Sequence, residues 1–174
     1  KDSGPVLNSE RIEKVFVLVT ESKRKQYYQL LEIIDEEVIG VSEEIIGMAA
    51  SRFGSDLNEH IHIALPDHIG FAIERIGRGI EIPNPFLPEI QALYTEEYAV
   101  AGDAILLVRD RLGVALPEEE QGFLALHFYA ARRDQPAKSV VRHTNVIRTM
   151  VQRIQEDLGY ELKDCDLIIE AIAE

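Results

Sequence analysis

The sequence predicts an all-α fold, because apolar residues recur at intervals of three and four over most of the chain. Several of these stretches end at a glycine, as helices with a C-terminal glycine cap do. Pro66 and Pro117 stand where two helices are expected to begin, since proline suits the first helical position. Together these observations predict a bundle of five or six helices up to Arg133 and one further helix after it.

Residues 1–21 depart from the helical pattern. They contain a Gly-Pro turn and the run "KVFVLV", whose β-branched and aromatic residues predict one strand. A lone strand needs partners that this sequence does not supply. We therefore interpret this segment as a linker and the tail of a missing β-rich domain.

The helical pattern begins near Ser22 and carries an apolar stripe up to Val38. Gly40 is expected to break this helix. Ser42 is then expected to cap the next one, which should end near Gly54.

A further helix is expected over 66–78, with Pro66 at its first position and Gly79 as its C-terminal cap. The preceding "EHIHIAL" alternates polar with apolar residues and fits either an extended or a helical segment. The remaining helices are expected over 86–93, from Thr95 to Gly113, and from Pro117 to about Arg133.

The best linker candidate is "RRDQPAKS", which is polar and contains a proline. An amphipathic helix over 140–158 follows it, closed by Gly159. One helix is not a domain. Residues 135–174 therefore predict a linker and the truncated start of a second domain, or a helix docked on the first.

The composition limits the possible partners and the compartment. Acidic residues outnumber basic ones 31 to 18, an excess spread through every segment, which disfavours direct binding to nucleic acid or to a membrane surface. The single cysteine, Cys165, cannot close an intrachain disulfide, and no apolar run approaches the roughly 20 residues that cross a bilayer. We expect a soluble cytoplasmic protein.

Four histidines, at positions 60, 62, 68 and 127, raise the alternative of a metal site. No His-Glu-x-x-His or Cys/His arrangement supports it, and His60 and His62 would share a metal only on an extended segment. We therefore favour exposed polar roles for His60 and His62. No nucleophile elbow or phosphate-binding glycine loop is present, so neither an enzyme nor a cofactor is predicted.

His68 is expected near the third position of the 66–78 helix, where unpaired amides attract an anion such as a phosphoryl group. Asp67 or Glu59 could hold one ring nitrogen and leave the other as a nucleophile. A capping or core histidine is the simpler alternative. Arg75 and Arg78 lie far along the same helix and would reach a phosphate only across another helix or a dimer; ordinary solvation with acidic i,i+4 partners is favoured for Arg78.

His127 lies in "GFLALHFYAARR" among apolar neighbours, which predicts a buried, neutral histidine. Together with "LNEHIHIALPDHIGFAIER" and "NPFLPEIQALYTEEYAVA", this motif resembles the PTS regulation domain (PRD) of BglG/SacY-family transcription antiterminators. The likeness covers residues 22–134 and is greatest to the glucose-operon (GlcT-like) members.

The resemblance implies a dimerising all-α domain of about five helices with regulatory histidines. It assigns phosphorylation to His68 in "DHI" and His127 in "ALH". It assigns supporting roles to the residues of the adjoining motifs, Asp67, Arg75, Asn58 and Glu59.

The resemblance further implies that phosphate comes from the sugar phosphotransferase system, from HPr or from the B domain (EIIB) of a sugar permease. Phosphorylation would switch a homodimer and thereby RNA binding by the missing N-terminal domain. The alternatives are a histidine-dependent metal sensor and a purely structural helical dimerisation module.

Overall fold

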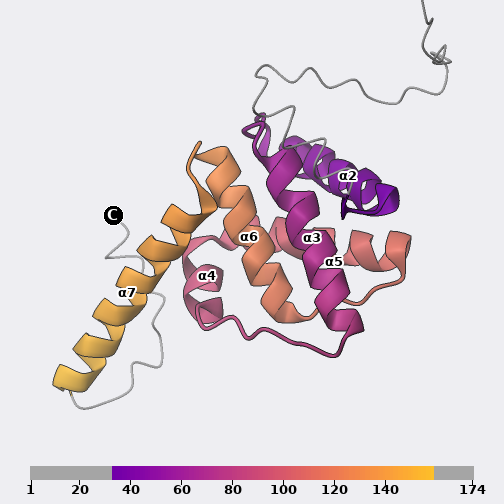
Figure 1. The fold of residues 1–174 in the computed structure, drawn as a ribbon. Helices are drawn as coiled ribbons and strands as arrows, with labels where there is room; N and C mark the ends of the chain where they lie inside the picture. The colour runs from indigo at the N-terminus through magenta and orange to yellow at the C-terminus, as the bar shows by residue number, and fades with distance from the viewer. Residues whose placement is uncertain (1–32, 159–174) are drawn as a thin grey trace, which may run out of the picture.

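The computed structural model describes residues 33–158, and within this range it is built of helices without a strand, which confirms the all-α prediction. Figure 1 shows α7 projecting from one side of the bundle that the other helices form. The predicted strand in 1–21, the first helical turns after Ser22 and the segment after Gly159 lie outside the described residues. The six helices are α2 (Glu36–Phe53), α3 (Ile61–Gly77), α4 (Leu87–Leu93), α5 (Thr95–Leu112), α6 (Glu118–Arg132) and α7 (Ala137–Leu158).

Helix α2 differs from the sequence-based expectation, because it runs through Gly40 and Ser42 without a break. Its N-cap is Asp35, whose side chain accepts a hydrogen bond from the amide of Glu37. Ser42 lies buried inside the helix, and its hydroxyl donates to the carbonyl of Val38 at 2.7 Å. The predicted break and the predicted N-cap at Ser42 were therefore wrong, whereas the end at Gly54, in the left-handed conformation, is confirmed.

Helix α3 begins at Ile61, five residues before the expected start at Pro66. The side chain of Asn58 accepts from the amide of His60 at 2.8 Å and organises the entry turn. The buried side chains continue on both sides of Pro66, at Ile61, Leu65 and Ile69. Their spacing of four residues favours one continuous helix. The prediction of a helix start at Pro66 was wrong, and His68 lies in the helix interior, away from the free amides of the first turn.

The later helices agree with the sequence. Helix α4 is short, as expected for "PNPFLPEIQALY", and α5 ends at Gly113 in the left-handed conformation. Pro117 precedes α6, whose first turn carries Glu118, Glu119 and Glu120 at the positive end of the helix dipole.

Helix α6 is central to the core and contacts α3, α4, α5 and α7. Leu124 and Phe128 on this helix are fully buried, and the Phe128 ring packs edge-on against Phe53 with centroids 6.1 Å apart. Figure 1 shows α3 and α6 running beside each other across the front of the bundle. Side chains on their facing sides therefore meet in the interior.

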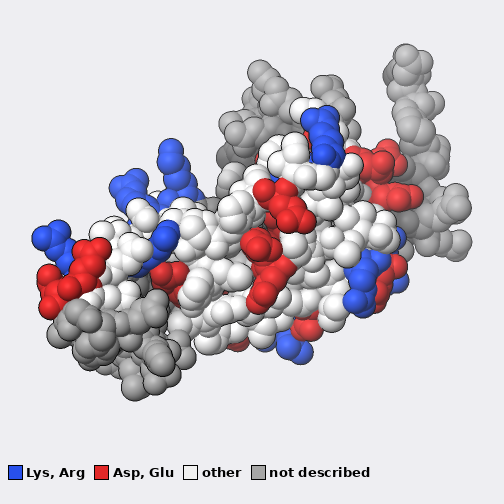
Figure 2. Space-filling model, turned by 90° about the horizontal axis from the view of Figure 1, so that it is seen from below, with Lys and Arg blue, Asp and Glu red and all other residues white. Residues whose placement is uncertain are grey.

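Helix α7 is docked on α4 and α6. Val140 and Thr144 are fully buried, and the Thr144 hydroxyl lies 3.3 Å from the hydroxyl of Tyr94. The helix carries four basic residues and only two acidic ones, so the expectation of an acidic excess in every segment was wrong here. Figure 2 shows basic side chains over this end of the molecule. The basic residues of α7 are Lys138, Arg142, Arg148 and Arg153, and the acidic ones are Glu156 and Asp157.

Gly122 in α6 is the site of a close helix contact. A Cβ at this position would lie 2.6 Å from Nδ2 of Asn84 and 2.9 Å from Cδ1 of Leu87. We expect Gly122→Ala to lower the free energy of unfolding by about 1–3 kcal/mol, because the added methyl group overpacks this contact. Urea unfolding followed by circular dichroism measures the change.

The matched control is Gly40→Ala in α2, where nothing lies within 4 Å of the added Cβ. Here the loss of backbone freedom in the unfolded chain should raise stability by about 0.5–1 kcal/mol. Equal effects at the two glycines would contradict the close contact at Gly122.

Candidate functional site

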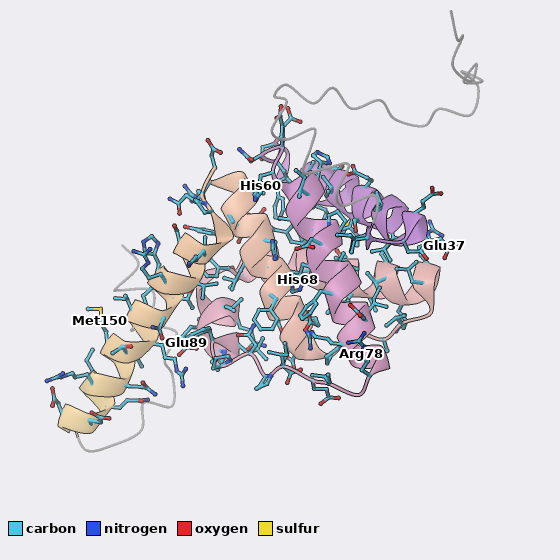
Figure 3. The ribbon with its side chains drawn as sticks, viewed as in Figure 1. Glu37, His60, His68, Arg78, Glu89 and Met150 are labelled. Carbon is cyan, nitrogen blue, oxygen red and sulfur yellow. The ribbon has the colours of Figure 1, made fainter. Side chains whose placement is uncertain are left out.

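Helices α3 and α6 bring together the two histidines predicted as phosphorylation sites. The rings of His68 and His127 have centroids 4.9 Å apart and planes inclined at 46°. Phe123 packs edge-on against the His68 ring at 6.0 Å. In Figure 3, His68 lies on the side of α3 that faces α6. The two predicted acceptors therefore occupy one place in the fold.

A buried ion pair lies beside the histidines. Nε2 of His68 is 2.9 Å from Oε2 of Glu120, and the other oxygen of Glu120 binds the guanidinium of Arg75. Glu120 is fully buried and Arg75 is 5% exposed. Arg75 also donates to the carbonyl of Ile80 at 3.4 Å. We call His68, His127, Arg75 and Glu120 the histidine site.

Burial lowers the pKa of His68 to about 4, since the interior disfavours its charged form. The positive charge of Arg75 lowers this pKa further, and the negative charge of Asp67 opposes the shift. Arg75 already pairs with Glu120, so the carboxylate nearest the ring does not act as an isolated negative charge. His68 is therefore neutral at pH 7.

His127 is neutral for similar reasons. Burial is the main cause that lowers its pKa to about 3, and the neighbouring His68 and His60 lower it further. A neutral imidazole has a lone pair on one ring nitrogen and can act as a nucleophile. The site thus presents two uncharged imidazoles next to a fixed guanidinium.

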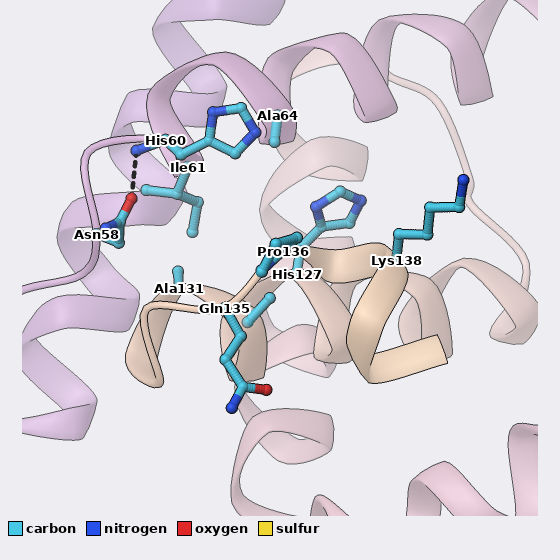
Figure 4. Close-up of a pocket in the computed structure, with 10 residues that line it drawn as sticks. Asn58, His60, Ile61, Ala64, His127, Ala131, Gln135, Pro136 and Lys138 are labelled. Carbon is cyan, nitrogen blue, oxygen red and sulfur yellow. Dashed lines mark hydrogen bonds between the residues drawn. The ribbon is translucent and has the colours of Figure 1, made fainter. Parts of the chain in front are cut away.

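A pocket of about 300 Å³ opens beside His127, between the start of α3, α6 and the start of α7. Figure 4 shows the rings of His60 and His127 at this pocket, with the side chain of Lys138 near it. None of the ten described residues that line it is acidic, although the chain carries a net charge of −13. The pocket therefore suits an anion better than most of the surface does.

The other predicted supporting residues have different positions. Asn58 joins α3 to the end of α6, because its backbone amide donates to the carbonyl of Ala131 at 3.0 Å and its side chain donates to Asp134. Glu59 and Asp67 are exposed. Of the four supporting residues predicted, Arg75 alone is part of the histidine site as defined above.

The four histidines of the metal alternative do not converge. Nδ1 of His62 lies 2.8 Å from the carboxylate of Glu43 on α2, whereas His68 faces Glu120 on α6. Among residues 33–158, no group of three or more His, Cys, Asp or Glu side chains could hold one metal ion. Arg78 forms the exposed i,i+4 ion pair with Glu74 that the sequence favours.

Sequence reasoning did not single out Glu120 as a member of the site. The available signal was spacing: Glu120 precedes His127 by seven residues, as His68 precedes Arg75 by seven. Seven residues are about two helical turns, so both pairs share a helix face. The two faces meet between α3 and α6.

A family model described as PRD domain matches residues 43–131, a range that includes all four members of the histidine site. The chain belongs to the PRD family. The sequence-based resemblance is thereby confirmed.

Several relatives of this PRD chain are named as antiterminators. Transcription antiterminator LicT of Bacillus subtilis (strain 168) is 36% identical over 94% of this chain and 59% of its own length. The beta-glucoside operon antiterminator of Dickeya chrysanthemi is 35% identical over 94% of this chain and 58% of its own. The PtsGHI operon antiterminator of B. subtilis is 39% identical over 90% and 56%. The chain thus spans under 60% of the length of these relatives.

A solved structure shares the fold. The crystal structure of GlcT CAT-PRDI superposes with a TM-score of 0.64 at 46% identity, over 67% of this chain and 69% of that one. The PRD relatives are named as regulators rather than enzymes. In the described part of this PRD chain, no helix is long and apolar enough to span a membrane.

Proposed function

We propose that this chain is the phosphorylation-controlled regulatory part of a transcription antiterminator. It accepts a phosphoryl group from HPr or from a permease EIIB domain on His68 or His127. The modification changes how two copies associate and so controls RNA binding by a domain outside this sequence. Residues 22–134 are the regulatory domain in this proposal, and 135–174 are a linker and the start of a second one.

The observation that carries the proposal is the pairing of two neutral imidazoles 4.9 Å apart beside a guanidinium. A phosphoryl group needs a nucleophile with a free lone pair, which a neutral imidazole provides. It also needs positive charge nearby. Arg75 pairs with the carboxylate that faces His68, and Lys138 lines the pocket next to His127. The antiterminator names of the PRD relatives supply the biological setting.

Phosphorylation would disturb the α3–α6 contact through charge. A phosphoryl group adds roughly −1.5 to −2 charges at pH 7. On His68 it would place this charge on the ring that the Glu120 carboxylate contacts, close to the Arg75–Glu120 pair. Because that pair is buried, the added charge is screened much less than at a surface. A shift of α3 against α6 is the expected response, and it would alter the surface that a second copy meets.

The test is phosphorylation of the purified chain by phosphorylated HPr and, separately, by a phosphorylated EIIB domain. Intact mass and acid lability identify phosphohistidine, and His68→Ala and His127→Ala locate it. Sedimentation before and after the reaction measures self-association. A chain that accepts no phosphate from either donor would overturn the proposal in favour of a structural dimerisation module.

We expect the two histidines to exclude each other as phosphate carriers. Two unit charges about 5 Å apart repel by about 3 kcal/mol at an effective dielectric constant of about 20, and phosphoryl groups carry more charge than this. The doubly phosphorylated chain should therefore be at least tenfold rarer than independent sites would give. Quantitative intact mass spectrometry measures both species, with the single alanine variants as references.

A further inference from the structure

The two ring nitrogens of His68 differ in their surroundings. Nε2 has essentially no solvent contact and faces Oε2 of Glu120 at 2.9 Å. The side chain as a whole is 19% exposed, so its accessible surface lies elsewhere. A donor protein that approaches the ring cannot reach Nε2 without displacing Glu120.

Glu120 is fixed in this position. It is fully buried in the first turn of α6, and its other oxygen binds Arg75, which is itself 5% exposed. Arg75 is further restrained by its hydrogen bond to the carbonyl of Ile80. The carboxylate therefore faces Nε2 with little freedom to turn away.

This arrangement selects one tautomer of the ring. Nε2 and the carboxylate oxygen are close but not aligned as a hydrogen bond, and neither atom has another hydrogen-bond partner among the described residues. At 2.9 Å a carboxylate oxygen repels a nitrogen lone pair and attracts an N–H. The proton therefore belongs on Nε2, and the lone pair belongs on Nδ1.

We propose that Nδ1 of His68 is the atom that accepts the phosphoryl group, and that Glu120 is the positioning residue that selects it. The inference rests on the proposed function and refines it to one atom. The structure assigns the product as the Nδ1 isomer of phosphohistidine.

The transfer conserves atoms and electrons. The Nδ1 lone pair forms the new N–P bond while the bond between phosphorus and the donor's histidine nitrogen or cysteine sulfur breaks, and the donor atom keeps that electron pair. The proton on Nε2 stays in place. The imidazole ring gains positive charge, which the carboxylate of Glu120 offsets from 2.9 Å. No oxidant or further reactant is required.

The test uses the full chain with His127→Ala, so that His68 carries any phosphate found. After reaction with phosphorylated HPr or EIIB domain, phosphorus NMR of the folded protein separates the Nδ1 and Nε2 isomers. We expect the Nδ1 isomer alone. The Nε2 isomer would overturn this inference and leave the proposed function intact. Absence of phosphohistidine at residue 68 would also overturn this inference, and the proposed function would then rest on His127 alone.

The role of Glu120 is tested by Glu120→Gln, which keeps the shape but provides an amide that can donate to Nε2 as well as accept from it. We expect phosphorylation at Nδ1 to slow by about tenfold or more, because the reacting lone pair is no longer held in place. Glu119→Gln, one residue away, is the matched control and should react at the wild-type rate. Amide NMR spectra verify that both variants are folded, and an unchanged rate in folded Glu120→Gln would contradict the role of Glu120.

Discussion

Glu120→Ala is expected to destabilise the chain by about 3–5 kcal/mol, the largest effect of any single substitution proposed for this protein. The substitution leaves the guanidinium of Arg75 buried without its carboxylate partner. It also removes the carboxylate that faces Nε2 of His68 at 2.9 Å. Urea unfolding at pH 7 measures the loss.

Two controls separate this effect from the general loss of an ion pair. Glu74→Ala breaks an exposed pair with Arg78, which should change stability by less than about 1 kcal/mol. The double variant Arg75→Met, Glu120→Leu removes both buried charges and should recover most of the stability. If Glu120→Ala and Glu74→Ala lower the free energy of unfolding equally, the buried Arg75–Glu120 pair contributes no more to stability than an exposed ion pair.

Acidification should destabilise the fold through the two buried histidines. The folded-state pKa of His68 is about 4, below the value of 6.5 for an unperturbed histidine. Between these values the unfolded chain binds a proton that the folded chain does not, so stability falls as the pH drops through this window. The expected loss from His68 alone is about 3 kcal/mol between pH 7 and pH 4. His127, with a pKa of about 3, adds to it in the same direction.

The measurement is the free energy of unfolding at several pH values for the wild type and for His68→Gln. The many carboxylates of this acidic chain also titrate in the range, and the comparison of the two proteins removes their contribution. The curve of the variant should be flatter by about 3 kcal/mol over this interval. Parallel curves would show that His68 is protonated equally in both states.

The helices could be predicted from the sequence where burial and capping signals agree. Gly54 and Gly113 end their helices as expected, since glycine adopts the left-handed conformation readily. Gly40 and Pro66 misled the prediction, because helix breakers act through local preferences that tertiary packing overrides. At both positions buried neighbours on each side, such as Val38 and Val41 or Leu65 and Ile69, stabilise one continuous helix.

The candidate site was predicted only in part. His68 and His127 stand in recognisable motifs, but their separation depends on the packing of α3 against α6, which no local pattern encodes. The anion-binding argument for His68 failed because the helix starts five residues earlier than expected. Glu120 was missed because burial of a charged residue depends on a partner from a distant segment, here Arg75, 45 positions earlier.

The pocket beside His127 has a wall that belongs to α7, since Pro136 and Lys138 stand at the start of that helix. A helix of 22 residues is about 33 Å long, and its far end moves with its base as a stiff rod. Tilting the rod by about 5° displaces its tip by about 3 Å over this length. A small change in how the base of α7 is seated beside His127 would therefore be enlarged at the far end of this helix, at Leu158.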